Sequence, residues 1–400
     1  MTTRDTLHFL TCGHVDDGKS TLIGRLLHDI GAIPEDQTAG AIVDGVIDYS
    51  RLTDGLEDER AQGITIDAAY RFFRHGGRHY RIADTPGHVQ YVRNMAVAAA
   101  NSDAVLVLVD ASHGVREQTV HHSRIAAFFG IRNFIVAVNK MDLVGYERER
   151  FDAIAENYRK ALGDISGVAL QFIPVSALNG VNLTSRGAHA KWYKGPSVLE
   201  ALAVLQVPPS PRHGACLPVQ LVVRTQDTRR GYMGSLSGGN IRVGGNLRVG
   251  DTGESITISE IFHSGRAVSE ARPGEAIMVL TEQDVDLSRG NVLYAPEAHM
   301  QPTDAFVARL LWLDPGFNHR DAVQCVLKVH NREELVEVQV QQSGHAFAEA
   351  KIFAATPLVI DAYHRNRATG LFMLIESETE KVIGIGTVLS PQDQEWGFSI

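Results

Sequence analysis

Apolar and polar positions follow two alternating patterns through the first half of the chain. Short apolar runs, such as the Ala-Val-Leu-Val-Leu-Val of residues 104–109, are typical of strands buried on both faces of a sheet. Between these runs, apolar residues recur three and four positions apart, which indicates amphipathic helices. The predicted strands cover 7–12, 68–73, 79–82, 104–109, 134–138 and 169–175, and the predicted helices 19–28, 89–100, 118–129, 150–162 and 197–205. This alternation predicts a mostly parallel sheet covered by helices on both faces.

The pattern changes after the proline-rich segment 207–212, which cannot continue a helix and suits an extended linker. Beyond it, short alternating segments separated by glycine-rich turns predict two antiparallel β-barrels. The predicted strands are 217–224, 231–237, 247–249, 255–262, 276–280 and 291–293, and then 305–312, 322–329, 335–341, 348–353, 358–363, 370–377 and 382–388. We therefore expect an α/β domain over 1–206, a linker over 207–212, and β-barrel domains over 213–300 and 301–400.

Composition narrows the class of protein. The 400 residues are 44% hydrophobic and 21% charged, which is ordinary for a soluble protein, and the net charge of −9 gives no support for broad nucleic-acid binding. The three cysteines are widely spaced and odd in number, which favours reduced thiols. No apolar run is long enough to cross a bilayer, and residues 1–5 lack the apolar region of a signal peptide. We expect a cytoplasmic protein that binds neither membrane nor nucleic acid.

A phosphate-binding loop is predicted directly after the first strand. Its pattern is glycine, four residues, glycine, lysine, and then serine or threonine. Backbone N–H groups of such a loop point at phosphate oxygens, the lysine reaches the outer phosphates, and the hydroxyl suits Mg²⁺. The loop leads into a helix N-terminus, which favours anions. The residues are Gly13, His14, Val15, Asp16, Asp17, Gly18, Lys19, Ser20 and Thr21.

Two further segments have the positions of nucleotide switches. The stretch 31–63 has no steady periodicity and leads into residues 63–67, which contain Thr65. The Thr65 hydroxyl either lies at a strand edge or closes on Mg²⁺ and the terminal phosphate. Its place between the phosphate loop and the next strand favours the second interpretation. The second segment follows a buried strand. Its carboxylate suits Mg²⁺, and its glycine allows the backbone to approach the terminal phosphate closely. Its histidine could position the attacking water. It comprises Asp84, Thr85, Pro86, Gly87 and His88.

The base-recognition residues are predicted at two later strand ends. An aspartate carboxylate can accept hydrogen bonds from N1–H and the exocyclic amine of guanine, a donor pair that adenine lacks. The first group is Asn139, Lys140, Met141 and Asp142, where Lys140 can lie along the base. The second is Ser176, Ala177 and Leu178, where the Ala177 N–H is a candidate donor to the guanine carbonyl.

In this order, the motifs resemble the translation-factor class of GTPases of the elongation factor Tu type. Within that class, the chain is most similar to the GTPase subunit family, subunit 1, of bacterial sulfate adenylyltransferases. Besides the phosphate loop, the stretches that carry this similarity are 22–29, 55–60, 93–95, 191–193 and 286–290.

The resemblance implies GTP and Mg²⁺ as ligands and a GTPase domain followed by two β-barrels. Ser20, Thr65 and Asp84 would face the Mg²⁺, whereas Lys19, Thr65 and His88 would act in hydrolysis, with Val15 and Ile64 gating access to the histidine. GTP hydrolysis would drive a separate catalytic subunit, a nucleotidyltransferase that makes adenosine 5′-phosphosulfate and pyrophosphate from ATP and sulfate in sulfate assimilation. The two would form a heterodimer or a higher assembly of it.

Other functions remain open at this point. A translation elongation factor that delivers aminoacyl-tRNA is the alternative, since net charge does not separate the two, although the stretches at Asp17 and 55–60 favour the first. An adenylate-using kinase fits Asn139 to Asp142 poorly. The sequence contains no second phosphate loop, so we expect no adenylylsulfate kinase activity of its own.

Overall fold

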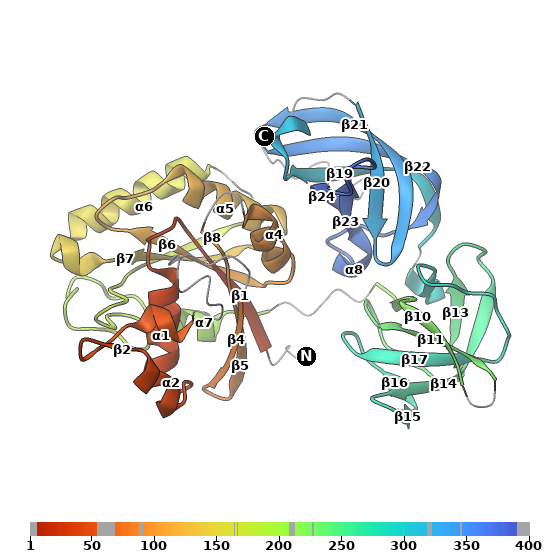
Figure 1. Cartoon of the computed structure of the whole chain (residues 1–400), viewed down its shortest axis with the longest axis horizontal. Helices are drawn as coiled ribbons and strands as arrows, with labels where there is room; N and C mark the ends of the chain where they lie inside the picture. The colour runs from red at the N-terminus through yellow and green to blue at the C-terminus, as the bar shows by residue number, and fades with distance from the viewer. Residues whose placement is uncertain are drawn as a thin grey trace. The chain divides into compact units, whose positions relative to one another are not determined.

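A computed structural model gives the structure of the chain for residues 6–53, 69–87, 91–163, 165, 167–207, 213–225, 228–298, 300–317, 322–344 and 346–389. The chain divides into two compact units, Met1–Pro209 and Ser210–Ile400 (Figure 1). Each unit is described by itself. The predicted residues Thr65 and His88 and most of the predicted linker, 208–212, lie outside the described residues.

The first unit is built on a six-stranded sheet in the order β4-β5-β1-β6-β7-β8. Only the pair β4 and β5 is antiparallel, and the other four pairs are parallel. All seven residues of β6 are buried, as the continuous apolar run predicts. The strands are β1 (Thr6–Cys12), β4 (Ala69–His75), β5 (Arg78–Asp84), β6 (Ala104–Asp110), β7 (Asn133–Asn139) and β8 (Ala169–Pro174).

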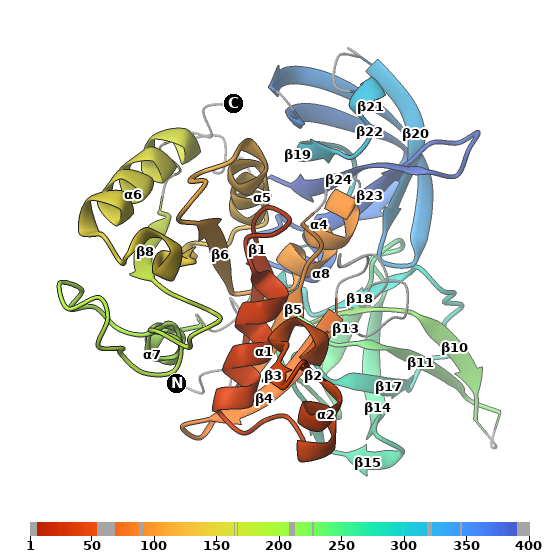
Figure 2. The same cartoon turned by 60° about the vertical axis from the view of Figure 1, so that its left-hand side comes forward.

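Helices cover both faces of this sheet. Figures 1 and 2 show α1 (Lys19–Asp29) and α7 (Val198–Val204) on one face, and α4 (Val92–Ala100), α5 (Glu117–Phe128) and α6 (Arg148–Leu162) on the other. One side of α1 is apolar, and its leucines and isoleucine pack with alternate residues of β1, β5 and β6. Helix α7 begins with a capping box in which the Ser197 hydroxyl and the Glu200 carboxylate satisfy each other's backbone N–H groups. The expected two-faced α/β architecture is therefore present.

The segment after α1 is more regular than its sequence indicates. It contains α2 (Glu35–Gly40), a hairpin of β2 (Ile42–Val43) and β3 (Val46–Ile47), and the 3-10 helix η1 (Tyr49–Leu52). The expectation of an irregular stretch is wrong for residues 35–52. The hairpin turns at Asp44 and Gly45, which both have positive φ, as a two-residue turn requires. Strands of two residues are too short to show a periodic pattern.

The second unit begins with an antiparallel sheet in the order β10-β11-β17-β14-β13-β18-β9, with β15 paired to β14. The single strand predicted over 217–224 is wrong, because the chain forms two strands with different partners: β9 pairs with β18, and β10 with β11. The strands are β9 (Cys216–Pro218), β10 (Leu221–Arg224), β11 (Arg230–Ser235), β13 (Asn246–Val249), β14 (Ser255–His263), β15 (Arg266–Val268), β17 (Ala276–Thr281) and β18 (Val292–Tyr294). A small pair joins β12 (Ile241–Arg242) to β16 (Glu270–Ala271).

The last part of the second unit is a closed antiparallel barrel, β19-β22-β21-β20-β23-β24. The two strands predicted over 348–353 and 358–363 are wrong in one respect. The whole of the first and residues 358–359 of the second belong to a single long strand, β22, and residues 360–363 are not in a strand. The pairing of β22 with β19 shifts register between Thr303 and Ala305, which accommodates Pro357 without a regular ladder. The elements are β19 (Pro302–Trp312), β20 (Ala322–Val329), β21 (Arg332–Gly344), β22 (Phe347–Val359), α8 (Arg367–Gly370), β23 (Leu371–Ile375) and β24 (Val382–Val388). Three-residue 3-10 turns, η4 (Pro296–Ala298) and η5 (Pro315–Phe317), flank β19.

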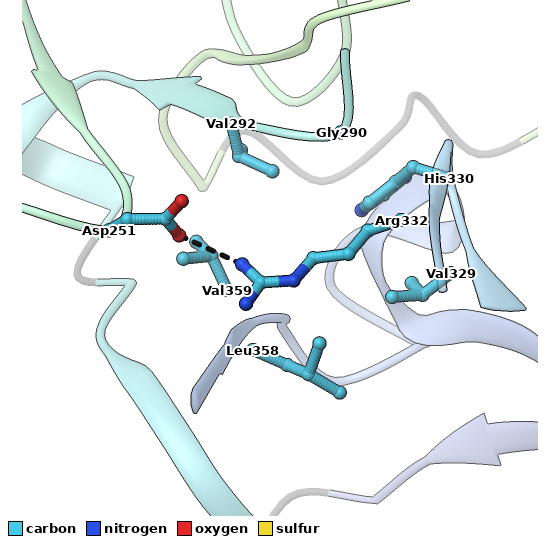
Figure 3. Close-up of a pocket in the computed structure, with 8 residues that line it drawn as sticks. All are labelled: Asp251, Gly290, Val292, Val329, His330, Arg332, Leu358 and Val359. Atoms are coloured by element: carbon cyan, nitrogen blue, oxygen red, sulfur yellow. Dashed lines mark hydrogen bonds and ion pairs between the residues drawn. The ribbon is translucent and has the colours of Figure 1, made fainter. Parts of the chain in front are cut away.

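Polar contacts join the two sheets of the second unit. Arg332, at the start of β21, lies 3.0 Å from the Asp251 carboxylate and donates a 2.8 Å hydrogen bond to the Thr356 hydroxyl. Figure 3 shows Arg332 and Asp251 at a small pocket, which His330 and the apolar Val292, Leu358 and Val359 also line. The ion pair and the apolar contacts hold the sheets against each other.

The three thiols, Cys12, Cys216 and Cys325, are free and buried. Burial raises the pKa of each to about 12. Among the described residues, no helix has the length and apolar character needed to cross a membrane.

Candidate nucleotide-binding site

The predicted motifs meet at the carboxyl ends of the parallel strands. The phosphate loop follows β1, while Asp84, Asp110 and Asn139 are the last residues of β5, β6 and β7. The register places Asp110 directly beside Asn139, and Thr11 beside Asp84. This edge of a doubly wound sheet is where such folds bind nucleotides.

Two glycines give the phosphate loop its shape. Gly13 has φ of 147° and Gly18 has φ of 88°, both in the region that favours glycine. A Cβ on Gly13 would lie 2.7 Å from the Leu108 carbonyl oxygen, and one on Gly18 would lie 2.6 Å from the Asn139 side-chain nitrogen. The loop is therefore pressed against β6 and β7, and α1 begins directly after Gly18.

Lys19 lies inside the loop. Its Nζ donates to the backbone carbonyls of His14 at 2.9 Å and Gly13 at 3.4 Å, and only 7% of the residue is exposed. Burial lowers the pKa of Lys19, and the nearby carboxylates of Asp84 and Asp17 oppose this shift. A buried cation beside backbone N–H groups at a helix N-terminus is the electrostatic arrangement that attracts phosphate.

Asp17 closes the loop from within. Its carboxylate accepts a 2.8 Å hydrogen bond from the His14 N–H, and the residue is buried. Burial raises the pKa of Asp17 to about 6, although the His14 N–H and the charge of Lys19 act in the opposite direction. Above this pH, the charged carboxylate helps to retain the Lys19 ammonium in the loop.

The end of β5 reaches the phosphate loop through Asp84 and Gly87. The buried Asp84 carboxylate accepts a 3.0 Å hydrogen bond from the Thr11 hydroxyl, and the Thr85 hydroxyl donates to the Thr11 carbonyl at 2.5 Å. A Cβ on Gly87 would lie 2.9 Å from the Val15 backbone nitrogen and 2.5 Å from Lys19 Nζ, so glycine is needed for this close approach to the loop. Residues 88–90, which include His88, lie outside the described residues.

Asn139 joins the two halves of the site. Its side-chain nitrogen donates to the Asp17 carbonyl at 2.8 Å, and its side-chain oxygen accepts from the Ala177 N–H at 2.9 Å. The Ala177 N–H, expected to face guanine, is thus held by Asn139 in this structure. A guanine carbonyl would have to share this donor, because the Ala177 N–H points at the side-chain oxygen of Asn139.

The other residues predicted to recognise the base follow strands β7 and β8 along the chain. Met141 is buried and donates its N–H to the Val175 carbonyl at 3.1 Å, which aligns the two loops. Asp142 lies half-buried in the 3-10 helix η3 (Met141–Val144), and the Ser176 hydroxyl accepts from the Asn179 N–H at 3.4 Å. Leu178 is 58% exposed.

Asp110 is a site residue that the sequence analysis did not identify. It accepts from Lys140 Nζ at 2.9 Å and from the Ser112 hydroxyl at 2.5 Å. Burial alone would raise the pKa of Asp110, but the hydrogen bonds from Ser112, Lys140 and His113 hold it well below the usual range. Lys140 itself has φ of 59°, so this ion pair stabilises a left-handed residue next to the base-recognition loop. The one sequence feature that could have identified Asp110 is its position at the end of the buried strand β6.

Two more residues missed by sequence analysis contact the phosphate loop and the end of β5. Gln118, in the first turn of α5, donates its side-chain amide to the Gly87 carbonyl. Arg116, just before this helix, places its guanidinium 3.1 Å from the ring nitrogens of His14. Among the described residues, no cluster of three or more His, Cys, Asp or Glu side chains could hold a metal ion.

Residues 4–217 match the family model of the elongation factor Tu GTP binding domain. The chain is 36% identical over 411 residues to sulfate adenylyltransferase subunit 1 of Francisella tularensis subsp. novicida (strain U112), covering 97% of this chain and 87% of that protein. It is 40% identical over 408 residues to the bifunctional enzyme CysN/CysC of Xylella fastidiosa (strain Temecula1), covering 96% of this chain. The chain spans 65% of the length of such bifunctional relatives.

A solved structure with a similar fold is that of a bacterial selenocysteine-specific elongation factor. The TM-score is 0.50 at 22% identity, and the match covers 97% of this chain and 58% of the other. Together with the family model, this match confirms the predicted fold class, an α/β GTPase domain followed by antiparallel sheets. Of the two barrels expected, the last, β19-β22-β21-β20-β23-β24, is closed, whereas the strands of 213–300 form an antiparallel sheet whose order runs from β10 to β9.

Proposed function

Because the chain belongs to the sulfate adenylyltransferase subunit 1 family of elongation factor Tu-type GTPases, we propose that it hydrolyses GTP to drive sulfate activation by a partner subunit. The observation that supports this most is the double hydrogen bond of Asn139. It ties the loop that surrounds Lys19 to the loop that follows β8, so phosphates and base would be held at a fixed separation. A rigid frame of this kind suits a purine nucleoside triphosphate.

Guanine is the proposed base. The Asp142 carboxylate, beside the Lys140–Asp110 ion pair, would accept from N1–H and the exocyclic amine. Asn139, Lys140 and Ser176 would complete the base site, with the N–H of Ala177 shared between Asn139 and the guanine carbonyl. The phosphate loop, residues 13–21, would hold the phosphates through its backbone N–H groups and Lys19.

Mg²⁺ is the proposed metal ion, and the donors present fit it. A hydroxyl from Ser20, a hydroxyl from Thr65 and the Asp84 carboxylate are hard oxygen ligands of the kind that Mg²⁺ prefers, alongside phosphate oxygens and water. The buried, Thr11-bonded Asp84 carboxylate has the fixed orientation that such a role requires. When bound, the ion would neutralise charge on the phosphates. His88 would orient the attacking water, and the Gly87 N–H would respond to the terminal phosphate.

The proposed partner is a separate adenylyl-transferring subunit that joins ATP and sulfate. Names of the relatives, sulfate adenylyltransferase subunit 1, support a chain that works within such an assembly. We also propose that residues 207–212 link the GTPase domain to the barrels. A switch that reorders with the terminal phosphate performs work only if a partner binds its two states differently.

Reconstitution with the catalytic subunit tests this function. The isolated chain should hydrolyse GTP slowly and form no adenosine 5′-phosphosulfate. Addition of the catalytic subunit should raise both GTP hydrolysis and product formation, and Lys19→Ala should abolish the stimulation. GTP-dependent binding of aminoacyl-tRNA, with no response to the catalytic subunit, would instead establish the translation-factor alternative.

A further inference from the structure

Arg25 connects helix α1 to the loop that follows the base-recognition strand β8. Its Nη1 donates to the Leu178 carbonyl oxygen at 2.5 Å, while its Nε donates to the Asp29 carboxylate at 2.8 Å, one turn further along the same helix. The two bonds use different edges of the guanidinium and therefore fix its plane. Leu178 is 153 positions away in sequence.

The guanidinium is enclosed on its other sides as well. It lies 4.9 Å from the centroid of the Tyr49 ring, within the range of a cation–π contact. Tyr49 is itself held close to α1, since a Cβ on Gly24 would lie 1.9 Å from the Tyr49 carbonyl oxygen. The Arg25 side chain thus has η1 on one side and the 176–180 loop on another.

Gly180 shows how closely this loop packs on Arg25. Its φ is 71°, and a Cβ there would lie 2.5 Å from Arg25 Nη2 and 2.8 Å from Cζ. A side chain there would displace the guanidinium, and the positive φ would strain it, so glycine lets the backbone of the loop lie directly against Arg25. The contact at Gly180 limits how closely the loop can approach α1, and the hydrogen bond to the Leu178 carbonyl holds the loop beside Arg25.

An ordinary surface ion pair would not have this environment. Arg148 and Asp152 on α6 have the same spacing as Arg25 and Asp29, but their side chains are 64% and 58% exposed, against 20% and 19% for Arg25 and Asp29. Holding a long side chain in one rotamer costs entropy, so an exposed pair contributes little. For Arg25, the additional contacts to Leu178, Tyr49 and Gly180 offset that cost.

We propose that Arg25 is a positioning residue for guanine recognition, which ties the 176–180 loop to the helix that begins at the phosphates. This inference rests on the proposed GTPase function. Asn139 joins the loop to the phosphate loop from the buried side, and Arg25 joins it to α1 from the outer side. The two connections together hold the base-recognition groups at a constant distance from Lys19.

The test compares a nucleotide that uses the base loop with one that does not. Equilibrium dissociation constants for GDP and ADP are measured by competition on the full chain and on Arg25→Ala. A lost charge-assisted hydrogen bond and a loosened loop should weaken GDP binding about tenfold, while ADP binding changes less than about twofold. Arg25→Lys keeps the charge without the planar fork and should fall between wild type and alanine. The matched control, Arg148→Ala, should change neither constant.

Amide hydrogen exchange supplies a second readout. In Arg25→Ala, the Val181 N–H, which donates to the Ser176 carbonyl at 3.1 Å, should exchange faster, whereas the amides of α1 should keep their protection. If the wild-type chain bound GDP and ADP equally, the proposed function itself would fail. The wild-type chain could instead prefer GDP while Arg25→Ala loses GDP and ADP affinity in equal proportion, or loses neither. That result would overturn the positioning role and leave the proposed function standing. Should the alanine variant not fold, Arg25→Lys is judged by the same ratio.

Discussion

The side-chain amide of Asn139, at the end of β7, lies 2.8 Å from the backbone carbonyl of Asp17 in the phosphate loop. The same side chain accepts from the Ala177 N–H. Asn139→Ala removes both bonds and leaves buried partners unsatisfied, at a cost of about 2–4 kcal/mol. We expect GDP affinity to fall roughly 30- to 1000-fold, measured by calorimetry. Asn101→Ala, which removes a hydrogen bond at an exposed side chain, is the control and should leave the affinity unchanged.

Asp142 should decide the choice of base. Changing Asp142 to Asn replaces two acceptor oxygens by one acceptor and one donor, which suits the 2-oxo group of xanthine. The variant should bind xanthosine triphosphate better than GTP, whereas the wild type should prefer GTP to both ATP and xanthosine triphosphate. Competition binding with the three nucleotides measures the order. Equal binding of ATP and GTP by the wild-type chain would refute the guanine assignment.

His88→Ala should separate hydrolysis from binding. The role proposed for His88 is on the attacking water, so the dissociation constant of GTP should stay within about twofold. Single-turnover hydrolysis should slow by about 10²–10⁴, the usual contribution of such a group. A variant with normal turnover would remove His88 from the mechanism, and one with lost binding would assign it to the ground state instead.

Protonation of His122 should make the first unit sensitive to acid. The ring is buried in α5, close to the charge of Lys19 and to the backbone of Gly13. Burial lowers the pKa of His122 from 6.5 to about 3, and the charge of Lys19 adds to the shift. As the pH falls below 6.5, the unfolded chain therefore binds a proton that the folded chain does not, and stability is lost.

Between pH 7.5 and pH 5, this single group should cost the wild type about 2 kcal/mol. His122→Gln should abolish that part of the pH dependence. The free energy of opening is measured from amide exchange of β6 and β7, which reports on the first unit alone. His75→Gln, at an exposed position, should retain the wild-type slope. An unchanged slope in His122→Gln would show that the ring takes up its proton in the folded state.

Gly24 and Gly40 form a matched pair of helical glycines. A Cβ on Gly24 would lie 1.9 Å from the Tyr49 carbonyl, whereas a Cβ on Gly40 would meet nothing within 4 Å. Gly24→Ala should therefore displace η1 and destabilise the first unit by about 1–3 kcal/mol. Gly40→Ala should be neutral or slightly stabilising through helix propensity. Thermal unfolding of both variants measures the contrast, and equal midpoints would show that η1 moves aside freely.

The sequence predicted those parts of the fold whose signals are long or chemically distinctive. The continuous apolar run at 104–109 is typical of a strand buried on both faces, and the structure has one there. The spacing of glycine and lysine over 13–19 leaves little freedom to the loop. Short elements gave weaker signals. The hairpin at Asp44 and Gly45 has strands of two residues, and the apolar stretch 217–224 conceals a change of partner between β9 and β10.

Within the site, the residues could be identified from sequence, but their partners could not. Nothing local to Ala177 indicates that its N–H belongs to Asn139, because that bond depends on the register of β7 and β8. The contact between Arg25 and Leu178 likewise arises only when the chain has folded. Thr65 and His88 remain predictions from their motifs.

Burial of all three cysteines has a chemical consequence. With thiol pKa values raised to about 12, the thiolate fraction at neutral pH is on the order of one in 10⁵. Alkylating agents and peroxide react with the thiolate, and they must also reach it. The three cysteines of the folded chain should thus resist peroxide and maleimides. A cysteine introduced at an exposed position would then be the only thiol that a maleimide labels.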